Sequence, residues 1–463
     1  MNNRQKALEY AQIMQESFLE QLKSFVNIPS ISTDPEKKAA MHAAAEWITA
    51  KLEDLGLNEV TIIPTEGHPV VYGECRCATR SNAPTVLIYG HYDVQPSEPD
   101  DLWHSPPFEA TVRGENLYGR GASDMKGQVA ASIFAVESIL KNGNMPVNIK
   151  FMIEGEEEIG SPNLNTFMEN HKELLACDVA LNPDSGMIAA DLPTITYALR
   201  GLAYFEIRVY GPEHDLHSGL FGGVVHNPAQ VLCELIAGMH DQDGRITLPG
   251  FYDRVRPLSA EERAELAKLP MDEEYYKRQT GVAALYGEKG FTPVERVGAR
   301  PSLDVNGIYS GFTGQGQKTV IPSWAMAKLS TRLVPDQDPA AVFDQLQQYL
   351  MEKAPKTVRW ELIQMSYGAA SISDIHHPAT QALASAFLSV WGKPPVYKRE
   401  GGSIPVVGNM QRILGVESVL TGFGLSDDNI HAPNEKLHLP TWYKGIQTLI
   451  HFFYNYGDQQ SII

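Results

Sequence analysis

A short apolar run that ends in a cluster of acidic residues constrains this chain more than any other stretch. Residues 149–153 are apolar apart from one lysine and follow a proline, which predicts a buried β-strand. Four carboxylates follow within five residues: Glu154, Glu156, Glu157 and Glu158. Open α/β sheets bind ligands at the carboxyl ends of their strands, and crowded like charges need protons or cations. The cluster therefore predicts either a metal site or, as most acidic runs do, a solvated loop.

Strands, polar turns and helices alternate through the first 200 residues. Apolar spacing predicts helices at about 7–26, 38–55 and 128–141. Strands are predicted at 61–63, 70–72, 85–89 and 178–182, and the continuous apolar run at 85–89 is typical of a strand buried on both faces. This alternation predicts an α/β sandwich.

The pattern changes near residue 201. Residues 204–210 and 325–333 alternate with a period of two, as half-exposed strands do, and helices are predicted at 228–239 and 339–353. The α/β style returns near residue 376. Because 463 residues are too many for one typical core, we expect an α+β domain at 201–375, inserted between catalytic segments 1–200 and 376–463.

The overall charge and the cysteines limit the partners and the compartment. The formal charge of −18 argues against nucleic acid or an anionic membrane as a partner, since both require a basic surface. Four cysteines are present, at positions 75, 77, 177 and 233, and we interpret them as reduced thiols of a cytoplasmic protein. A soft metal site at Cys75 and Cys77 is a weaker alternative. No stretch has the length of a membrane span, and the first residues lack the apolar core of a signal peptide.

Five polar turns each follow a predicted strand or open a predicted helix. Imidazole and carboxylate side chains are the ligands of Zn²⁺ and similar ions. A two-metal site needs a bridging carboxylate and about two further ligands for each ion. Taken singly, each turn is equally well an ordinary turn or a surface residue. Together they match a dinuclear site: His91 with Asp93, Asp124, Glu157 with Glu158, Asp184, and His431.

His91 and Asp93 lie two residues apart at the end of a predicted strand. Residues at this spacing point to the same face. Asp93 can then hold the distal ring nitrogen of His91 and fix its tautomer.

The motifs resemble those of the cytosolic nonspecific dipeptidases and carnosine dipeptidases. These belong to a dinuclear metallopeptidase family that also includes glutamate carboxypeptidase, aminoacylase and succinyl-diaminopimelate desuccinylase. The similar segments span nearly the whole chain: GHYDVQP (90–96), GRGASDMKGQ (119–128), EGEEEIGS (154–161), LHSGLFGG (216–223), KTVIP (318–322), RLVP (332–335), EGGSIP (400–405) and DDNIHAPNEK (427–436). The resemblance implies a three-layer zinc-peptidase-like catalytic domain and an inserted ferredoxin-like domain that forms a lid and a homodimer interface.

The resemblance also implies a role for individual residues. His91 and Asp184 would bind one ion, Glu158 and His431 the other, and Asp124 both; Glu157 would be the general base and Asp93 would orient His91. Zn²⁺ is the first expectation for both ions, with Mn²⁺ or Co²⁺ as alternatives. Glu154 and Glu156 are expected to be supporting or solvated. The substrate would be bound by His217 (donated by the partner subunit), Arg332, Thr319, Gly402 and Ser403.

Three functional hypotheses follow. The first is a two-metal dipeptidase, which the GHYDVQP, KTVIP and EGGSIP segments favour. The second is an N-acyl-amino-acid deacylase or desuccinylase of the same family. The third is a catalytically silent binding protein, for which we would expect a missing ligand or base; none is missing.

Overall fold

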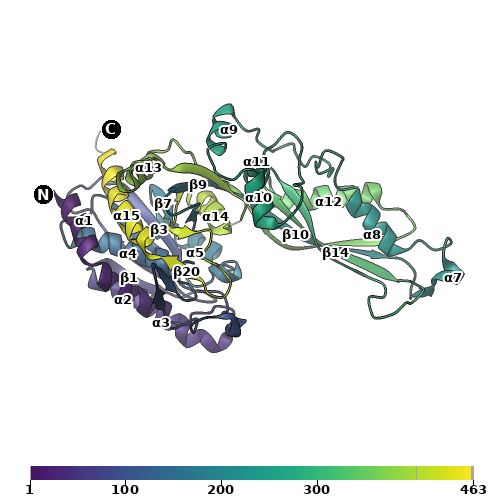
Figure 1. Ribbon diagram of the computed structural model, residues 1–463, viewed down its shortest axis with the longest axis horizontal. Coiled ribbons are helices and arrows are strands. Elements are labelled where there is room, and N and C mark those ends of the chain that lie inside the picture. Colours follow the sequence, from purple (N-terminus) through teal and green to yellow (C-terminus); the bar gives the residue numbers. More distant parts are fainter. Residues whose placement is uncertain (1, 403, 460–463) are drawn as a thin grey trace. The chain divides into compact units, whose positions relative to one another are not determined.

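The computed structural model describes residues 2–402 and 404–459. They form two compact units (Figure 1). The first unit comprises residues 1–197, 373–397 and 409–463, and the second comprises 198–372 and 398–408. The two main junctions lie three residues before the boundaries expected from the sequence, and the short segment 398–408 groups with the second unit rather than with the first.

The first unit is built on a mixed β-sheet. Its strand order is β1-β2-β6-β3-β7-β18-β9, and β6, β3, β7 and β18 run parallel to one another. Strands β1, β2 and β9 pair with their neighbours in the antiparallel direction. The strands are β1 (Asn58–Ile63), β2 (Val70–Cys75), β3 (Thr85–His91), β6 (Asn148–Glu154), β7 (Val179–Asn182), β9 (Thr194–Leu199) and β18 (Glu417–Leu420).

Both faces of this sheet are covered, which gives the three layers expected from the resemblance. Val86 and Ile88 of β3 enter the main core, whereas Leu87 and Tyr89 are equally buried on the other face. On that other face Lys150 of β6 donates to the carbonyl of Leu174, at 2.7 Å. Leu174 belongs to α6 (Lys172–Leu175), which follows α5 (Leu164–Asn170). The main core contains residues of α1 (Asn3–Ile13), α2 (Gln15–Val26), α3 (Lys38–Asp54), α4 (Lys126–Leu140), α13 (Pro378–Trp391) and α15 (Leu439–Gln459).

The prediction of one continuous helix at the start of the chain is wrong. The helix expected at about 7–26 is two helices, α1 and α2, that meet at Met14. Helix α1 begins earlier than expected, because Asn2 and Gln5 form a capping box at its start. Helix α1 packs on both α15 and α4, whereas α2 packs mainly on α4 and accepts one hydrogen bond from Tyr443 of α15 at the Gln15 carbonyl.

The second unit has a ferredoxin-like arrangement. Its main elements follow the order strand, helix, strand, strand, helix, strand, and the sheet order is β12-β14-β10-β15 with antiparallel pairing throughout. Two helices cover one face of the sheet (Figure 1). The elements are β10 (Gly201–Tyr210), α8 (Pro228–Ala237), β12 (Ser302–Ser310), β14 (Trp324–Leu333), α12 (Pro339–Lys353) and β15 (Arg359–Gly368).

Shorter elements complete the two units. The insert at 240–298 contains α9 (Ala260–Leu266), α10 (Glu273–Thr280) and α11 (Pro293–Ala299). The others are β4 (Thr111–Arg113), β5 (Asn116–Tyr118), β8 (Gly186–Met187), β11 (Leu216–His217), α7 (Ser218–Phe221), β13 (Val320–Ile321), β16 (Ser371–Ile372), β17 (Val396–Glu400), α14 (Pro405–Leu414), β19 (Gly424–Leu425), β20 (Lys436–His438), and the 3-10 turns η1 (Pro35–Lys37), η2 (Asp100–Leu102) and η3 (Glu157–Ile159). Within the described residues, no helix combines the length and the hydropathy that a membrane span requires.

Candidate metal centre

Three parallel strands deliver the first part of the site. Strands β6, β3 and β7 are neighbours, so their carboxyl ends meet at one edge of the sheet. His91 is the last residue of β3 and pairs with Glu154, the last residue of β6. Asp184 follows β7 by two residues, and its backbone N–H donates to the side chain of Asn182. The acidic cluster of β6 therefore stands beside a histidine and an aspartate from adjacent strands.

Two groups of three side chains have the spacing of metal ligands. The first is His91, Asp124 and Asp184, and the second is Asp124, Glu158 and His431. Within each group the candidate ligand atoms lie within 4.8 Å of one another. Asp124 belongs to both groups, which is the arrangement that two ions bridged by one carboxylate require.

The two oxygens of Asp124 face the two groups separately. Its Oδ1 lies 3.2 Å from Nε2 of His91, and its Oδ2 lies 3.0 Å from Nε2 of His431. The same His431 nitrogen lies 3.2 Å from Oε2 of Glu158. All five residues predicted to bind metal are thus brought together.

Asp93 lies behind His91, on the side away from Asp124. Nδ1 of His91 is 3.0 Å from the Asp93 carbonyl oxygen and 3.4 Å from its Oδ1. Both Asp93 carboxylate oxygens accept backbone N–H groups, from Glu157 at 3.2 Å and from Glu158 at 3.1 Å. Asp93 therefore ties the histidine to the turn η3 that carries Glu157 and Glu158.

The four acidic residues of the cluster separate into two pairs. Glu157 and Glu158 lie in η3, and Glu158 accepts a 2.8 Å hydrogen bond from Gln95. Glu154 accepts from the hydroxyls of Tyr89 and Ser161, and Glu156 from the backbone N–H of His68. Both are nearly completely buried and make supporting contacts, which is the first of the two alternatives expected for them.

Glu435 organises the loop that carries Asp124. Its carboxylate accepts the backbone N–H groups of Gly121, Ser123 and Asp124, at 3.0 to 3.1 Å, and pairs with Arg120 at 2.7 Å. Glu435 and Arg120 are each 1% exposed, so this pair is sealed from water. Glu435 and Gln95 were not among the predicted site residues; both lie inside similar segments of the sequence, but no local spacing marks them.

The loop that carries His431 has an unusual backbone. His431 has a φ of 61°, and its neighbours Asn429 and Asn434 are also in the left-handed region. Such conformations cost energy for a residue other than glycine and are often retained at functional sites. Asp428 anchors the loop: it accepts from the Ser123 hydroxyl at 2.8 Å and from Lys436 at 2.9 Å. The loop is thereby fixed to the segment that carries Asp124.

The electrostatics of the cluster favour cations. Burial, with the charge of Asp124, raises the pKa of Asp184 well above its ordinary value, and burial raises the pKa of Glu157 to about 7. Hydrogen bonds to Asp124 and Glu158 raise the pKa of His431 to about 10. When all are ionised, Asp124, Glu157, Glu158 and Asp184 carry four negative charges, which two divalent cations would balance. The donor set, imidazole and carboxylate, also suits such ions.

Four of the predicted substrate-binding residues, His217, Thr319, Arg332 and Gly402, lie in the second unit. His217 ends β11 and pairs with Val320 of β13, while the Thr319 carbonyl accepts the N–H of Ser218, so Thr319 lies beside His217. His217 is exposed, and its Nδ1 accepts the N–H of Gly219 at 2.9 Å. Arg332 lies on β14 opposite Leu202. Gly402 follows β17 in the segment grouped with the second unit, and Ser403 lies outside the described residues.

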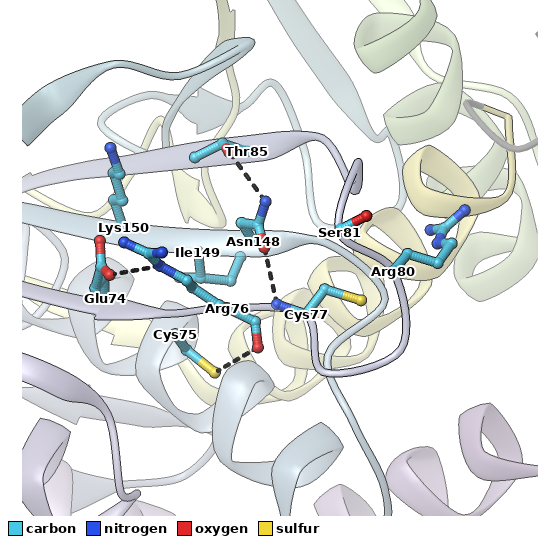
Figure 2. Close-up of a pocket in the computed structure, with 10 residues that line it drawn as sticks. All are labelled: Glu74, Cys75, Arg76, Cys77, Arg80, Ser81, Thr85, Asn148, Ile149 and Lys150. Atoms are coloured by element: carbon cyan, nitrogen blue, oxygen red, sulfur yellow. Dashed lines mark hydrogen bonds and ion pairs between the residues drawn. The ribbon is translucent and has the colours of Figure 1, made fainter. Parts of the chain in front are cut away.

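The first unit also has a cavity of about 390 Å³, which is lined by none of the predicted metal-binding or substrate-binding residues. Cys75 and Cys77 line it together with Arg76, Arg80 and Lys150 (Figure 2). It also contains Thr85 and Asn148, the first residues of β3 and β6, so it lies at the opposite strand ends from His91. Neither cysteine belongs to a group of three potential ligands among the described residues, which argues against the soft metal site.

The shared carboxylate gives a direct prediction for metal binding. Asp124→Asn should lose both ions, because a neutral amide removes one negative charge and one bridging oxygen from each ligand group. Metal content after dialysis, measured by mass spectrometry, checks this. Asp191→Asn is the matched control, since the Asp191 side chain is 84% exposed and pairs only with Lys393. An Asp124→Asn protein that retains two ions per chain would contradict the bridging role.

Comparison with known proteins identifies the family. The model of Peptidase family M20/M25/M40 matches residues 87–455. The Cys-Gly metallodipeptidase of Candida albicans is 33% identical over 460 residues, which cover 95% of this chain and 94% of that protein. The human beta-Ala-His dipeptidase is 32% identical over 471 residues, which cover 97% of this chain and 92% of that protein.

Solved structures agree with this assignment. An M20 family metallo-carboxypeptidase from Sulfolobus solfataricus superposes with a TM-score of 0.83 at 34% identity, covering 95% of this chain and 99% of that chain. Human carnosine dipeptidase 1 superposes with a TM-score of 0.79 at 31% identity, covering 99% of each chain. The fold, the candidate dinuclear site and these similarities confirm the predicted family: the chain belongs to Peptidase family M20/M25/M40.

Proposed function

We propose that the chain is a metallodipeptidase, which hydrolyses the peptide bond of dipeptides with two divalent cations and a glutamate general base. The observation that carries the proposal is the pair of ligand groups sharing Asp124, with Glu157 next to the candidate ligand Glu158. Similarity along almost the whole chain to proteins named as Cys-Gly and beta-Ala-His dipeptidases supports dipeptides as the substrate.

The metal ligands would divide as the two groups suggest. His91 and Asp184 would hold one ion, Glu158 and His431 the other, and Asp124 both. Zn²⁺ is our first assignment because imidazole and carboxylate form its usual ligand set, with Mn²⁺ or Co²⁺ as alternatives. When bound, such ions lower the pKa of a water molecule and polarise a substrate carbonyl. Asp93 would keep His91 in one tautomer and orientation.

Glu157 would move the proton. Burial raises the pKa of its carboxyl group to about 7 in the metal-free protein, and bound cations would lower it, so that the carboxylate can accept a proton near neutral pH. Glu157 would accept a proton from the attacking water and donate it to the leaving amine. Its backbone N–H is fixed by Asp93, which holds η3 in place during both transfers.

The second unit would bind the ends of the substrate. Arg332 would pair with the terminal carboxylate, a role suited to a planar guanidinium. His217 of one subunit would donate to the substrate carbonyl bound by the partner subunit, where negative charge develops. Thr319, Gly402 and Ser403 would line the same pocket. The second unit would thus act as both a lid and a dimerisation domain.

The general base is tested by a pair of adjacent variants. Glu157→Gln should lower kcat by roughly 10²- to 10⁴-fold while both ions are retained, because the amide cannot accept the proton. Glu156→Gln is the matched control, since Glu156 is also buried but contacts His68 and Asn163 instead of the candidate ligands. Steady-state kinetics and metal analysis check both. If Glu156→Gln abolished turnover and Glu157→Gln did not, the two roles would be exchanged.

The substrate class is tested by a panel of substrates run with a series of metals. We expect Ala-Gly and related dipeptides to be cleaved with a much higher kcat/KM than N-acetyl or N-succinyl amino acids, under Zn²⁺, Mn²⁺ and Co²⁺. Release of the amino acid product is the measurement. Preference for the N-acyl substrates would instead identify a deacylase or desuccinylase of the same family. Failure to hydrolyse any substrate with any ion would revive the silent binding protein.

The homodimer is tested at the exposed apolar side chains near His217. Leu220 is 74% exposed and Val224 is 83% exposed, and large apolar side chains with such exposure mark interaction surfaces when they cluster. Leu220→Glu with Val224→Glu should convert the protein to a 51.2 kDa monomer in light scattering and reduce its turnover. Ile13→Glu, at a 73% exposed position of the first unit, is the control. A fully active monomer would contradict the cross-subunit role of His217.

We also propose a cytoplasmic location. The four cysteines are free thiols, as expected for a protein from a reducing compartment.

A further inference from the structure

One face of the second unit's sheet is polar, and two arginines lie on it. Ala203, Phe205 and Ile207 of β10 point into the core of this unit, so Leu202 and Tyr204 point to the opposite face. Arg332 pairs with Leu202 across β14 and therefore shares that face. Arg200 lies two residues before Leu202, so the alternation of an extended chain places it on the same face as Leu202 and Arg332.

Arg200 is partly buried and lacks the acidic partner that the three buried arginines have. Arg120, Arg300 and Arg399, the three arginines below 9% exposure, each form an ion pair with a glutamate. Arg200 is partly buried, and its Nε donates to the Gly401 carbonyl at 3.0 Å. Among the described residues it forms no ion pair, and its two terminal nitrogens have no hydrogen-bond partner. A partly buried guanidinium whose terminal N–H groups are not engaged by the described residues can donate charge-assisted hydrogen bonds to an anion.

The charge of Arg332 adds to the positive surroundings of Arg200. Burial and the charge of Arg332 lower the pKa of Arg200 to about 10, which also means that the two guanidinium groups lie near each other. Asp304 and Glu400 act in the opposite direction and raise the pKa of Arg200, but only in part, since neither forms an ion pair with it. Gly401 permits the close approach, because a Cβ there would stand 3.2 Å from Nη2 of Arg200.

We infer that Arg200 is a second carboxylate-binding residue, which acts with Arg332 on the C-terminal residue of the substrate. The inference rests on the proposed dipeptidase function and extends it to a specificity residue that no motif in the sequence identified. Nε is already held by Gly401, so the guanidinium is fixed in orientation and presents its terminal N–H groups to the ligand. The ligand chemistry is a carboxylate, and two substrate groups can supply it.

The two sources are the α-carboxylate and the side chain of a C-terminal Asp or Glu. Both arginines would share the α-carboxylate in the first case. In the second, Arg332 would bind the α-carboxylate and Arg200 the side chain, which would make dipeptides with an acidic C-terminal residue the preferred substrates.

The experiment compares wild type with Arg200→Gln on two matched substrate pairs. One pair is Ala-Gly and its C-terminal amide, and the other is Ala-Glu and Ala-Gln. Loss of a charged hydrogen-bonding group should reduce kcat/KM for the carboxylate substrate by roughly 10- to 100-fold, mainly through KM, and leave its neutral partner little changed. A reduced Ala-Gly preference over the amide identifies the α-carboxylate as the source. A reduced Ala-Glu preference over Ala-Gln identifies the side chain. Arg200→Lys should restore part of either preference, because it retains the charge.

Arg208→Gln is the matched control. Arg208 lies on the same face of β10 but pairs with Glu206 at 2.6 Å, so both substrate preferences should stay at their wild-type values. Thermal unfolding and metal content show whether the Arg200→Gln protein is folded and loaded as wild type is. If such a protein kept both substrate preferences, the inference would be overturned.

A binding measurement separates this inference from the proposed function. Calorimetric titration of the metal-loaded protein with N-acetylglycine, N-acetylglutamate and N-acetylglycinamide detects carboxylate binding without turnover. Wild type should bind the acids more tightly than the amide, and Arg200→Gln should lose most of that difference. If wild type hydrolysed no dipeptide, the proposed function would fail, and the titration would still decide the role of Arg200. Equal binding by the two proteins would reject it.

Discussion

Repulsion among the carboxylates at the carboxyl ends of β3, β6 and β7 is the constraint on which the rest of the structure depends. Asp124, Glu157, Glu158 and Asp184 approach one another closely enough for burial and mutual charge to raise the pKa of Glu157 and Asp184. A protein that held these groups together without compensation would be destabilised by them. The surrounding chain therefore supplies two histidines and many N–H donors, and two divalent cations would balance the four carboxylates when all are ionised.

The supporting contacts come from residues far apart in the sequence. Glu435 receives three backbone N–H groups from the loop around Asp124, more than 300 residues earlier, and Asp93 receives two from η3. An ion pair as buried as Arg120 with Glu435 contributes little net stability by itself, because desolvation opposes the Coulomb attraction. Its effect is geometric, since it fixes the direction in which Asp124 presents its two oxygens. The left-handed backbone at His431 is held by the same kind of contact, through Asp428.

The parts of the fold and the site that the sequence predicted are those with local signals. Apolar runs of strand length predicted β3, β6 and β7, and the polar residue after each run predicted a candidate ligand. The break at Met14 could not be predicted, because the apolar residues recur near helical spacing on both sides of it. The burial of Glu156 depends on the direction of a single turn, which composition does not specify. Glu435 and Gln95 act through contacts with distant segments, and the grouping of residues 398–408 with the second unit depends likewise on tertiary packing.

In the second unit's sheet, the period-two pattern of the sequence separates the side chains of the core from those of the opposite face. Alternation along β10 assigns Phe205 and Ile207 to a core and leaves the opposite face free to carry charge. A shift of one residue in the pairing of β10 with β14 would move Arg332 into the apolar core. The register that stabilises the unit therefore also keeps Arg332 on the opposite face. Arg200 depends on the same register but receives no carboxylate from the described residues. The chain has 56 acidic residues and a formal charge of −18, so the missing partner of the partly buried Arg200 does not reflect a shortage of acids.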